Sequence, residues 1–160
     1  KKNRFSDREE DSMKLGKIIH LGIVVEDLEK AVKIYEETLG IGPWEIQDAR
    51  EFFAQMRVNG GHGLEIRTAM FHGDGYEIEL ITPTGEGVYA DWLREKGPGL
   101  HHVKFDTADS YQTITGEAEK ISGRPPYLNV EWPDGRPLVA YADLLKEAGL
   151  LIEVSGGEEA

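Results

Sequence analysis

A short histidine-containing stretch occurs twice in this chain, and no other feature limits the possible fold as strongly. The two copies are Ile19–Glu26 and Gly99–Asp106. Both are typical of strands, because β-branched and apolar residues recur in them and a loop-to-helix signal follows each copy. The repeat predicts that the chain consists of two copies of one unit, and that each copy contributes a histidine to a shared site.

The alternation of side chains in a strand decides which histidines are equivalent, because neighbouring side chains point to opposite faces. In the first copy the odd offsets from His20 carry a continuous apolar face, made of Leu21, Ile23 and Val25. Counting from His102 gives an apolar face again, whereas counting from His101 would place Lys104 on that face. The pattern therefore pairs His20 with His102 and predicts that His101 points the other way.

Each copy continues with a helix and three further strands, so the expected fold class is α+β. Apolar residues at helical spacing predict helices at 27–39 and 110–121. Further strands are predicted near 44–47, 63–70 and 75–81, and again near 127–131, 138–142 and 150–155. The expected layout is a flexible leader at 1–16, a first βαβββ module at 17–83, a connector at 84–98, a second βαβββ module at 99–155 and a tail at 156–160.

Composition excludes several kinds of function. The formal net charge of −12 argues against nucleic-acid binding, since phosphate contacts need clustered Lys and Arg. The chain contains no cysteine, which excludes disulfides and thiolate chemistry and fits the reducing cytoplasm. No apolar run is long enough to span a bilayer, and the charged start is not typical of a signal peptide. We expect a cytoplasmic protein with no membrane or nucleic-acid partner.

The last strand of each copy contains a glutamate between apolar neighbours, Glu79 in the first copy and Glu153 in the second. A carboxylate inside an apolar strand costs several kcal/mol unless it is paired or binds a cation. The same anomaly at equivalent places predicts that both glutamates join the two histidines. Two nitrogen and two oxygen ligands suit one divalent metal ion, and Co, Ni, Zn, Mn and Fe are not distinguished. Glu77 has the same parity as Glu79 and is the alternative ligand.

Four stretches of the chain together carry a family resemblance, and they are Ile19–Val25 with Asp27–Ala31, Gly99–Val103, Glu79–Ile81 before Pro83, and Leu151–Val154. They resemble the vicinal oxygen chelate superfamily, which includes glyoxalase I, methylmalonyl-CoA epimerase, extradiol dioxygenases and antibiotic-resistance proteins. The likeness covers about residues 17 to 155, and the second copy looks most like the epimerases. It implies paired βαβββ modules whose mixed sheets curl around one metal ion, with the ligands His20, Glu79, His102 and Glu153.

The resemblance also implies a reaction. A metal ion with open positions can polarise a carbonyl and stabilise the enolate that forms when a neighbouring carbon-bound proton leaves, and a carboxylate then moves that proton. By likeness to the epimerases, the two bases would be Glu153 and Glu65. Glu65 and Arg67 share a parity, and a solvated pair on a sheet face is the alternative. The expected function is a metal-dependent epimerase acting on a small carbonyl or thioester substrate, with a homodimer as one possible assembly.

Two other functions fit the same residues. A glyoxalase I-like lyase acting on a thiol hemithioacetal needs the same four ligands but not Glu65. A binding protein of the resistance type would hold a small molecule without turning it over. An iron dioxygenase is less well matched, because such sites usually use two histidines and one carboxylate. His62 and His72 lie in glycine-rich turns and are expected to be exposed rather than catalytic.

Overall fold

The protein is described by a computed structural model that covers residues 13–156. The elements, in chain order, are β1 (Ile18–Val24), α1 (Leu28–Glu37), β2 (Glu45–Asp48), α2 (Arg50–Ala54), β3 (Arg57–Val58), β4 (Gly61–His62), β5 (Ile66–His72), β6 (Glu77–Pro83), α3 (Val88–Lys96), β7 (Gly99–Phe105), α4 (Tyr111–Ser122), β8 (Leu128–Glu131), β9 (Pro137–Leu144), α5 (Leu145–Ala148) and β10 (Leu150–Ser155). The predicted fold class, α+β, is confirmed.

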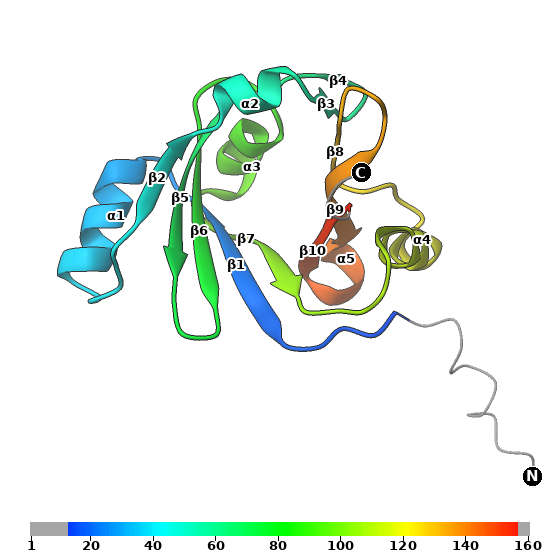
Figure 1. The fold of residues 1–160 in the computed structure, drawn as a ribbon, viewed down its shortest axis with the longest axis horizontal. Helices are drawn as coiled ribbons and strands as arrows, with labels where there is room; N and C mark the ends of the chain where they lie inside the picture. Colours follow the sequence, from blue (N-terminus) through cyan, green and yellow to red (C-terminus); the bar gives the residue numbers. More distant parts are fainter. Residues whose placement is uncertain (1–12, 157–160) are drawn as a thin grey trace, which may run out of the picture.

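Within the described residues the strands form one ten-stranded mixed sheet, in the order β2-β5-β6-β1-β7-β10-β9-β8-β3-β4. The sheet curls into an open C, with α1 and α4 on its outer side (Figure 1). The curl brings the two halves of the sheet to face each other across its inner side. The predicted curvature of the sheet is therefore confirmed.

The two halves of the sheet repeat the same pairing. In each half the first strand pairs in parallel with the last one, β1 with β6 and β7 with β10. The other neighbours, β5 with β6 and β9 with β10, are antiparallel. The halves meet where β1 and β7 pair antiparallel, so the two histidine-bearing strands lie next to each other at the centre of the sheet. This seam is what brings the repeated histidines together.

One helix covers the outer face of each half. In α1, the Asp27 side chain caps the helix by accepting a hydrogen bond from the Lys30 N–H at 2.9 Å, and Leu28 and Val32 are buried against the first half of the sheet. In α4, Ile114 and Ala118 are buried against the outer side of β9 and β10. The outer helices therefore leave the inner face of the sheet free to carry polar side chains.

A segment of the first half crosses over to the second half. After β2 the chain forms α2, then β3, and β3 pairs antiparallel with β8 at the far edge of the sheet. Figure 1 shows α2, β3 and β4 spanning the open side of the C. The sequence analysis placed only a turn at Gly60–Gly63, because two-residue strands leave no readable alternation. Asn59 and Gly60 both have positive φ, as the tip of a tight hairpin requires.

The inner face has its own apolar core, to which both halves contribute. The connector between the halves forms α3, whose Tyr89 and Trp92 pack there with Val24, Ile81 and Leu151. This core occupies the middle of the curl and borders the polar side chains described below. None of the helices within residues 13–156 combines the length and the hydrophobicity needed to cross a membrane.

The ends of the chain lie partly outside the described residues, which begin at Met13 and end at Gly156. The predicted leader at 1–16 therefore falls mostly outside them, as does the tail beyond Gly156. The last residues of that leader are attached to the fold. The Gly16 N–H donates to the Asp106 carbonyl at 2.7 Å, and Met13 and Leu15 pack against the α4 core.

Candidate metal centre

Two histidines and two glutamates converge on the inner face of the sheet. The Nε2 atoms of His20 and His102 lie 3.3 Å apart. The Glu79 Oε1 atom lies 3.7 Å from each of these nitrogens. The Glu153 Oε1 atom lies 3.9 Å from His102 Nε2. The structure therefore brings together all four residues that the repeat singled out, and each comes from a different strand: β1, β6, β7 or β10.

The central position of these strands explains why the four side chains meet. β6, β1, β7 and β10 are consecutive in the sheet, and alternation turns one polar side chain of each toward the inner face. Gly22 pairs with His102 across the seam. A Cβ atom at Gly22 would lie 2.0 Å from the Cε1 atom of His102, so the missing side chain leaves the space for this imidazole. The sequence analysis missed this role, although a glycine inside an apolar strand is a signal of close approach.

The prediction that His101 points away from His102 is wrong. The pairing of β1 with β7 shifts register between Gly22 and Ile23, where Gly22 faces His102 and Ile23 faces Leu100. His101 is the extra residue in this bulge, which breaks the alternation on which the prediction relied. As a result the two neighbouring imidazoles lie side by side, with their Nδ1 atoms 3.1 Å apart.

Aromatic rings hold both imidazoles in place. The His102 ring stacks on Tyr141, with ring centroids 4.3 Å apart and planes at 19°. The Tyr141 hydroxyl is hydrogen-bonded to the Tyr89 hydroxyl at 2.6 Å, and both phenols are buried. Burial raises the pKa of Tyr89 and of Tyr141 well above the usual value, so both remain neutral phenols. These aromatic residues were not among the predicted site residues.

The site concentrates negative charge in a buried place. Burial would lower the pKa of His20, but the neighbouring carboxylates of Glu79 and Glu153 outweigh it and raise this pKa. Burial also raises the pKa of Glu153. For His102, burial and the neighbouring imidazoles lower the pKa well below its usual value. A neutral His102 beside two carboxylates is the electrostatic pattern that a bound cation would stabilise.

The donor set and its spacing both fit a divalent metal ion. Ligand atoms that are each about 2.0–2.2 Å from one first-row ion are separated from one another by about 3.0–3.5 Å. The measured separations of 3.3 and 3.7 Å among His20, His102 and Glu79 are close to this range. These three residues also form the one group within the described chain whose ligand atoms all lie within 4.8 Å of one another. Glu153 would be the fourth ligand.

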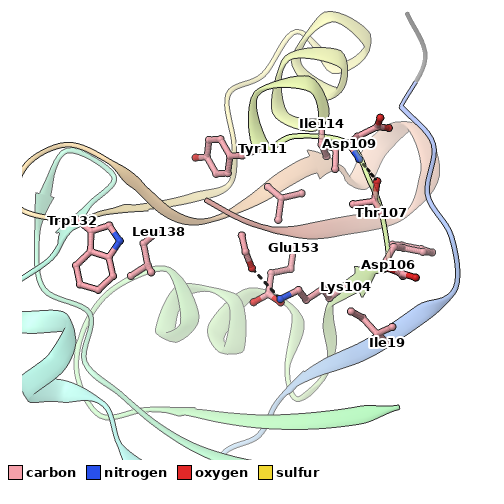
Figure 2. Close-up of a pocket in the computed structure, with 13 residues that line it drawn as sticks. Ile19, Lys104, Asp106, Thr107, Asp109, Tyr111, Ile114, Trp132, Leu138 and Glu153 are labelled. Atoms are coloured by element: carbon pink, nitrogen blue, oxygen red, sulfur yellow. Dashed lines mark hydrogen bonds and ion pairs between the residues drawn. The ribbon is translucent and has the colours of Figure 1, made fainter. Parts of the chain in front are cut away.

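Lys104 lies next to the cluster and was not predicted to belong to it. Its Nζ atom donates to Ser155 Oγ at 2.9 Å and lies 3.9 Å from the Glu153 carboxylate. Figure 2 shows Lys104 and Glu153 together on the wall of a cavity of about 790 Å³, with Trp132 at the opposite end. A second cavity of about 390 Å³ is bordered by Glu153 from another direction and is largely apolar. Glu153 therefore stands between two spaces large enough for parts of a substrate.

Glu65 does not join the cluster in this structure. It lies before β5, its side chain is exposed, and a Cβ atom at Gly85 would meet its carboxylate. Its neighbours Leu64 and Ile66 are buried and line the smaller cavity instead. Arg67, the partner of Glu65 in the alternative interpretation, pairs with Glu29 at 2.5 Å. A catalytic role for Glu65 stays a prediction.

The remaining candidates lie apart from the four residues. Glu77, the alternative ligand, pairs with His72 Nδ1 at 2.5 Å at the end of the β5–β6 hairpin. His72 is exposed, with 62% of its side chain accessible, as the sequence analysis expected. Of the two glutamates on β6, Glu79 is therefore the one that faces the histidines.

Comparison with known proteins identifies relatives of this chain. Residues 19–120 match the family model described as the Glyoxalase/Bleomycin resistance protein/Dioxygenase superfamily. An ethylmalonyl-CoA/methylmalonyl-CoA epimerase from Cereibacter sphaeroides is 31% identical over 97 residues, which are 59% of this chain and 63% of that protein. An uncharacterised protein, YqjC, from Bacillus subtilis is 29% identical over 57% of both chains. The chain thus spans about 60% of the length of these curated relatives.

Solved structures share the fold at lower identity. A methylmalonyl-CoA epimerase from Mycobacterium tuberculosis superposes with a TM-score of 0.57 and 21% identity, covering 90% of this chain and 89% of that one. A Streptomyces coelicolor methylmalonyl-CoA epimerase in complex with 2-nitronate-propionyl-CoA gives a TM-score of 0.56 and 24% identity, covering 88% of this chain and 96% of that one.

Proposed function

Since the chain belongs to the glyoxalase/bleomycin resistance/dioxygenase superfamily, we propose that it is a metal-dependent isomerase that moves a proton on the carbon next to a carbonyl. The observation that carries the proposal is the convergence of His20, Glu79, His102 and Glu153 from four strands onto one point. A divalent ion held by these residues would supply the positive charge that makes the adjacent C–H bond acidic.

Glu153 is the proposed base. Its carboxylate borders both cavities, so it faces the space where a substrate would lie. Burial raises its pKa, which makes it a better proton acceptor than an exposed carboxylate. Epimerisation also needs a proton donor on the other face of the planar intermediate. Glu65 is the predicted second group, and Glu79 is a further carboxylate that lines the smaller cavity together with Glu153.

The proposed substrate is a CoA thioester of a branched malonate. The Cereibacter sphaeroides relative is named as an epimerase of such thioesters. Lys104 supports the assignment, because it is the one cation among the described residues that line either cavity, and it lies beside the proposed base. Its ammonium group would hold the free carboxylate of the malonyl unit by a charge-assisted hydrogen bond.

A glyoxalase I-like lyase that acts on a thiol hemithioacetal is the second candidate. It uses the same four ligands and does not need Glu65. The exposed position of Glu65, outside both cavities at Glu153, is the observation that favours it. Both candidates share the metal, the carbonyl substrate and the proton transfer, and they differ in the substrate and in the need for a second base.

The test follows exchange of the substrate proton with solvent. Purified chain loaded with Co²⁺ is incubated in D₂O with methylmalonyl-CoA, and deuterium at the substrate carbon is measured by mass spectrometry. We expect incorporation that is lost in Glu153→Gln and retained in Glu119→Gln, a control on the exposed face of α4. Unchanged exchange in Glu153→Gln would remove Glu153 from the mechanism.

The same Co²⁺-loaded chain also distinguishes the epimerase from the lyase. Loss of exchange in Glu65→Gln would support the epimerase with Glu65 as its second base. Full activity of that variant on the hemithioacetal of methylglyoxal and glutathione, with no exchange into the thioester, would support the lyase. Tight binding of either compound without turnover would instead support a small-molecule-binding protein of the resistance type.

A further inference from the structure

Three histidines are buried among the described residues, and His101 is the one that the proposed function does not use. Only 3% of its surface is accessible. Four aromatic rings surround its imidazole at centroid distances of 4.4 to 5.8 Å, and they belong to Tyr89, Trp92, Tyr127 and Tyr141. Its Nε2 atom has no hydrogen-bond partner within the described residues. A buried polar atom without a partner is rare enough to require an explanation.

Among the described residues, the one hydrogen-bonding contact of the His101 side chain is with a proposed metal ligand. Its Nδ1 atom lies 3.1 Å from the Nδ1 atom of His102. At this distance the two Nδ1 atoms can share a hydrogen bond, in which one atom carries the hydrogen and the other accepts it. Two arrangements are possible, and they differ in what they leave at the Nε2 atom of His102.

In the first arrangement His102 donates from Nδ1 and its Nε2 atom is an unprotonated lone pair. His101 then carries its hydrogen on Nε2, among the aromatic rings. In the second arrangement His101 donates from Nδ1, so its own Nε2 lone pair faces those rings and the Nε2 atom of His102 is protonated. Aromatic faces carry partial negative charge, which attracts an N–H group and repels a lone pair. The aromatic enclosure of His101 therefore favours the first arrangement.

We propose that His101 is a positioning residue that accepts the Nδ1 hydrogen of His102 and thereby keeps the Nε2 atom of His102 free to bind the metal. The bulge between β1 and β7 makes this possible, because it places the two imidazoles side by side instead of on opposite faces. Tyr141 fixes the plane of the His102 ring by stacking, and His101 fixes which nitrogen carries the hydrogen. The inference rests on the proposed metal site but concerns a residue outside the ligand set.

Two substitutions separate this role from simple packing. His101→Phe keeps a ring in the aromatic enclosure and removes the acceptor. His101→Asn loses the ring, but its side-chain oxygen can take the place of Nδ1 as an acceptor. His72→Asn, at an exposed position in the β5–β6 hairpin, is the matched control for loss of a histidine.

The first readout is the affinity for Co²⁺ and Zn²⁺, measured by competition with a coloured chelator. We expect His101→Phe to bind about 10- to 100-fold more weakly than the unmodified chain, as is typical when a partner behind a metal-binding histidine is lost. His101→Asn should recover most of this loss, and His72→Asn should bind as the unmodified chain does. A merely structural role predicts the reverse order, because asparagine fills the enclosure less well than phenylalanine.

The second readout needs no metal. Nitrogen-15 NMR of the metal-free chain reports which imidazole nitrogen of each histidine carries hydrogen. We expect hydrogen on Nδ1 of His102 and on Nε2 of His101, and loss of this preference in His101→Phe. Hydrogen on Nε2 of His102 in the unmodified chain, or unchanged affinity in His101→Phe, would overturn the inference. If the unmodified chain binds neither ion, the proposed function fails, while the NMR result still decides the hydrogen-bond direction.

Discussion

Gly22 shows how one missing side chain can set the geometry of a site. It faces His102 across the seam between β1 and β7, and the imidazole occupies the volume that a Cβ atom would take. The obstructing atoms belong to an imidazole ring that also stacks on Tyr141. Because the ring is buried and a Cβ atom would lie 2.0 Å from it, even the smallest side chain at this position displaces a proposed ligand.

We therefore expect Gly22→Ala to weaken metal binding at least tenfold and to lower the free energy of unfolding by about 1–3 kcal/mol, as overpacking of a filled interior does. Gly116→Ala is the control, because a Cβ atom there would meet nothing within 4 Å and helix α4 favours alanine. Chelator competition and urea unfolding measure the two effects. Equal affinities in the two variants would show that His102 is not confined by Gly22.

Lys104 gives a second prediction at the same scale. If its ammonium group holds the free carboxylate of a malonyl substrate, Lys104→Met should raise KM for methylmalonyl-CoA about tenfold or more and change kcat less, since the lost contact is present before and during proton transfer. Steady-state kinetics on the metal-loaded enzyme test this. A lower kcat with an unchanged KM would place Lys104 in the proton transfer instead.

The sequence could predict a site residue only where the residue leaves a recognisable pattern in the sequence itself. His20 and His102 form one pair and Glu79 and Glu153 another, each with one member in each copy and in equivalent surroundings, so the repeat marks them without any knowledge of the fold. His101 was oriented wrongly because a bulge is set by the pairing of two distant strands and leaves no local mark. Tyr141 acts on a ligand from another element, so no nearby pattern reveals it, whereas Gly22 inside an apolar strand signals a close approach without naming the residue that approaches.

At the scale of elements, the corner between β9 and α5 is held by a charged cluster. Arg124, just after α4, pairs with Asp143 at 3.2 Å and with Glu147 at 2.8 Å. Burial opposes the charge of Asp143, but hydrogen bonds from Arg124 and from the Leu145 N–H outweigh it and lower the pKa of Asp143. The hydrogen bond from Arg124 also lowers the pKa of Glu147. The cluster ties the end of α4 to the strand pair that carries Glu153.

These shifts predict a pH-dependent contribution to stability. Because both carboxyl pKa values are lower in the folded chain, the contribution is fully present above their usual range and is lost as the pH falls through the folded values. Arg124→Met should therefore lower Tm at pH 7, and the difference from the unmodified chain should shrink as the pH falls below the usual range of the two carboxyl pKa values. Arg136→Met, which removes a local exposed pair with Asp134, is the control and should change Tm little. A constant difference across this pH range would contradict the assignment.

The elements that the sequence predicted are those with enough residues to show a period. α1, α4 and the long strands of both halves fall where alternation or helical spacing placed them. The elements that it missed are short: α2, β3, β4 and α5 have five residues or fewer. β3 depends on a partner strand in the other half, and such a pairing cannot be read from local sequence.

At the scale of the whole molecule, the proposed metal ion would join the two halves. Two of its ligands lie on β1 and β6 and two on β7 and β10. An ion that binds only the folded chain stabilises it by mass action, by about 2.7 kcal/mol at a free concentration 100 times the dissociation constant. Removal of the metal should therefore loosen the connection between the halves as well as abolish activity.

We expect a chelator to lower Tm by about 5–10 °C relative to the Co²⁺-loaded chain, since 1 kcal/mol corresponds to about 2–4 °C for a chain of this length. Differential scanning calorimetry measures the change. In Glu79→Gln the effect of the chelator should be much smaller, because the site has lost a charged ligand. A chelator effect of the same size in that variant would mean that the ion acts elsewhere on the chain.

The segment from α2 to β4 belongs to the first half by sequence and to the second half by strand pairing. Phe52 and Phe53 of α2 line the smaller cavity beside Glu153, while none of the four proposed ligands lies on this segment. Insertions or substitutions here would therefore reshape the smaller cavity and leave the proposed base and the proposed metal ligands unchanged. During evolution, changes confined to the segment from α2 to β4 could therefore alter substrate preference without changing the proposed metal site.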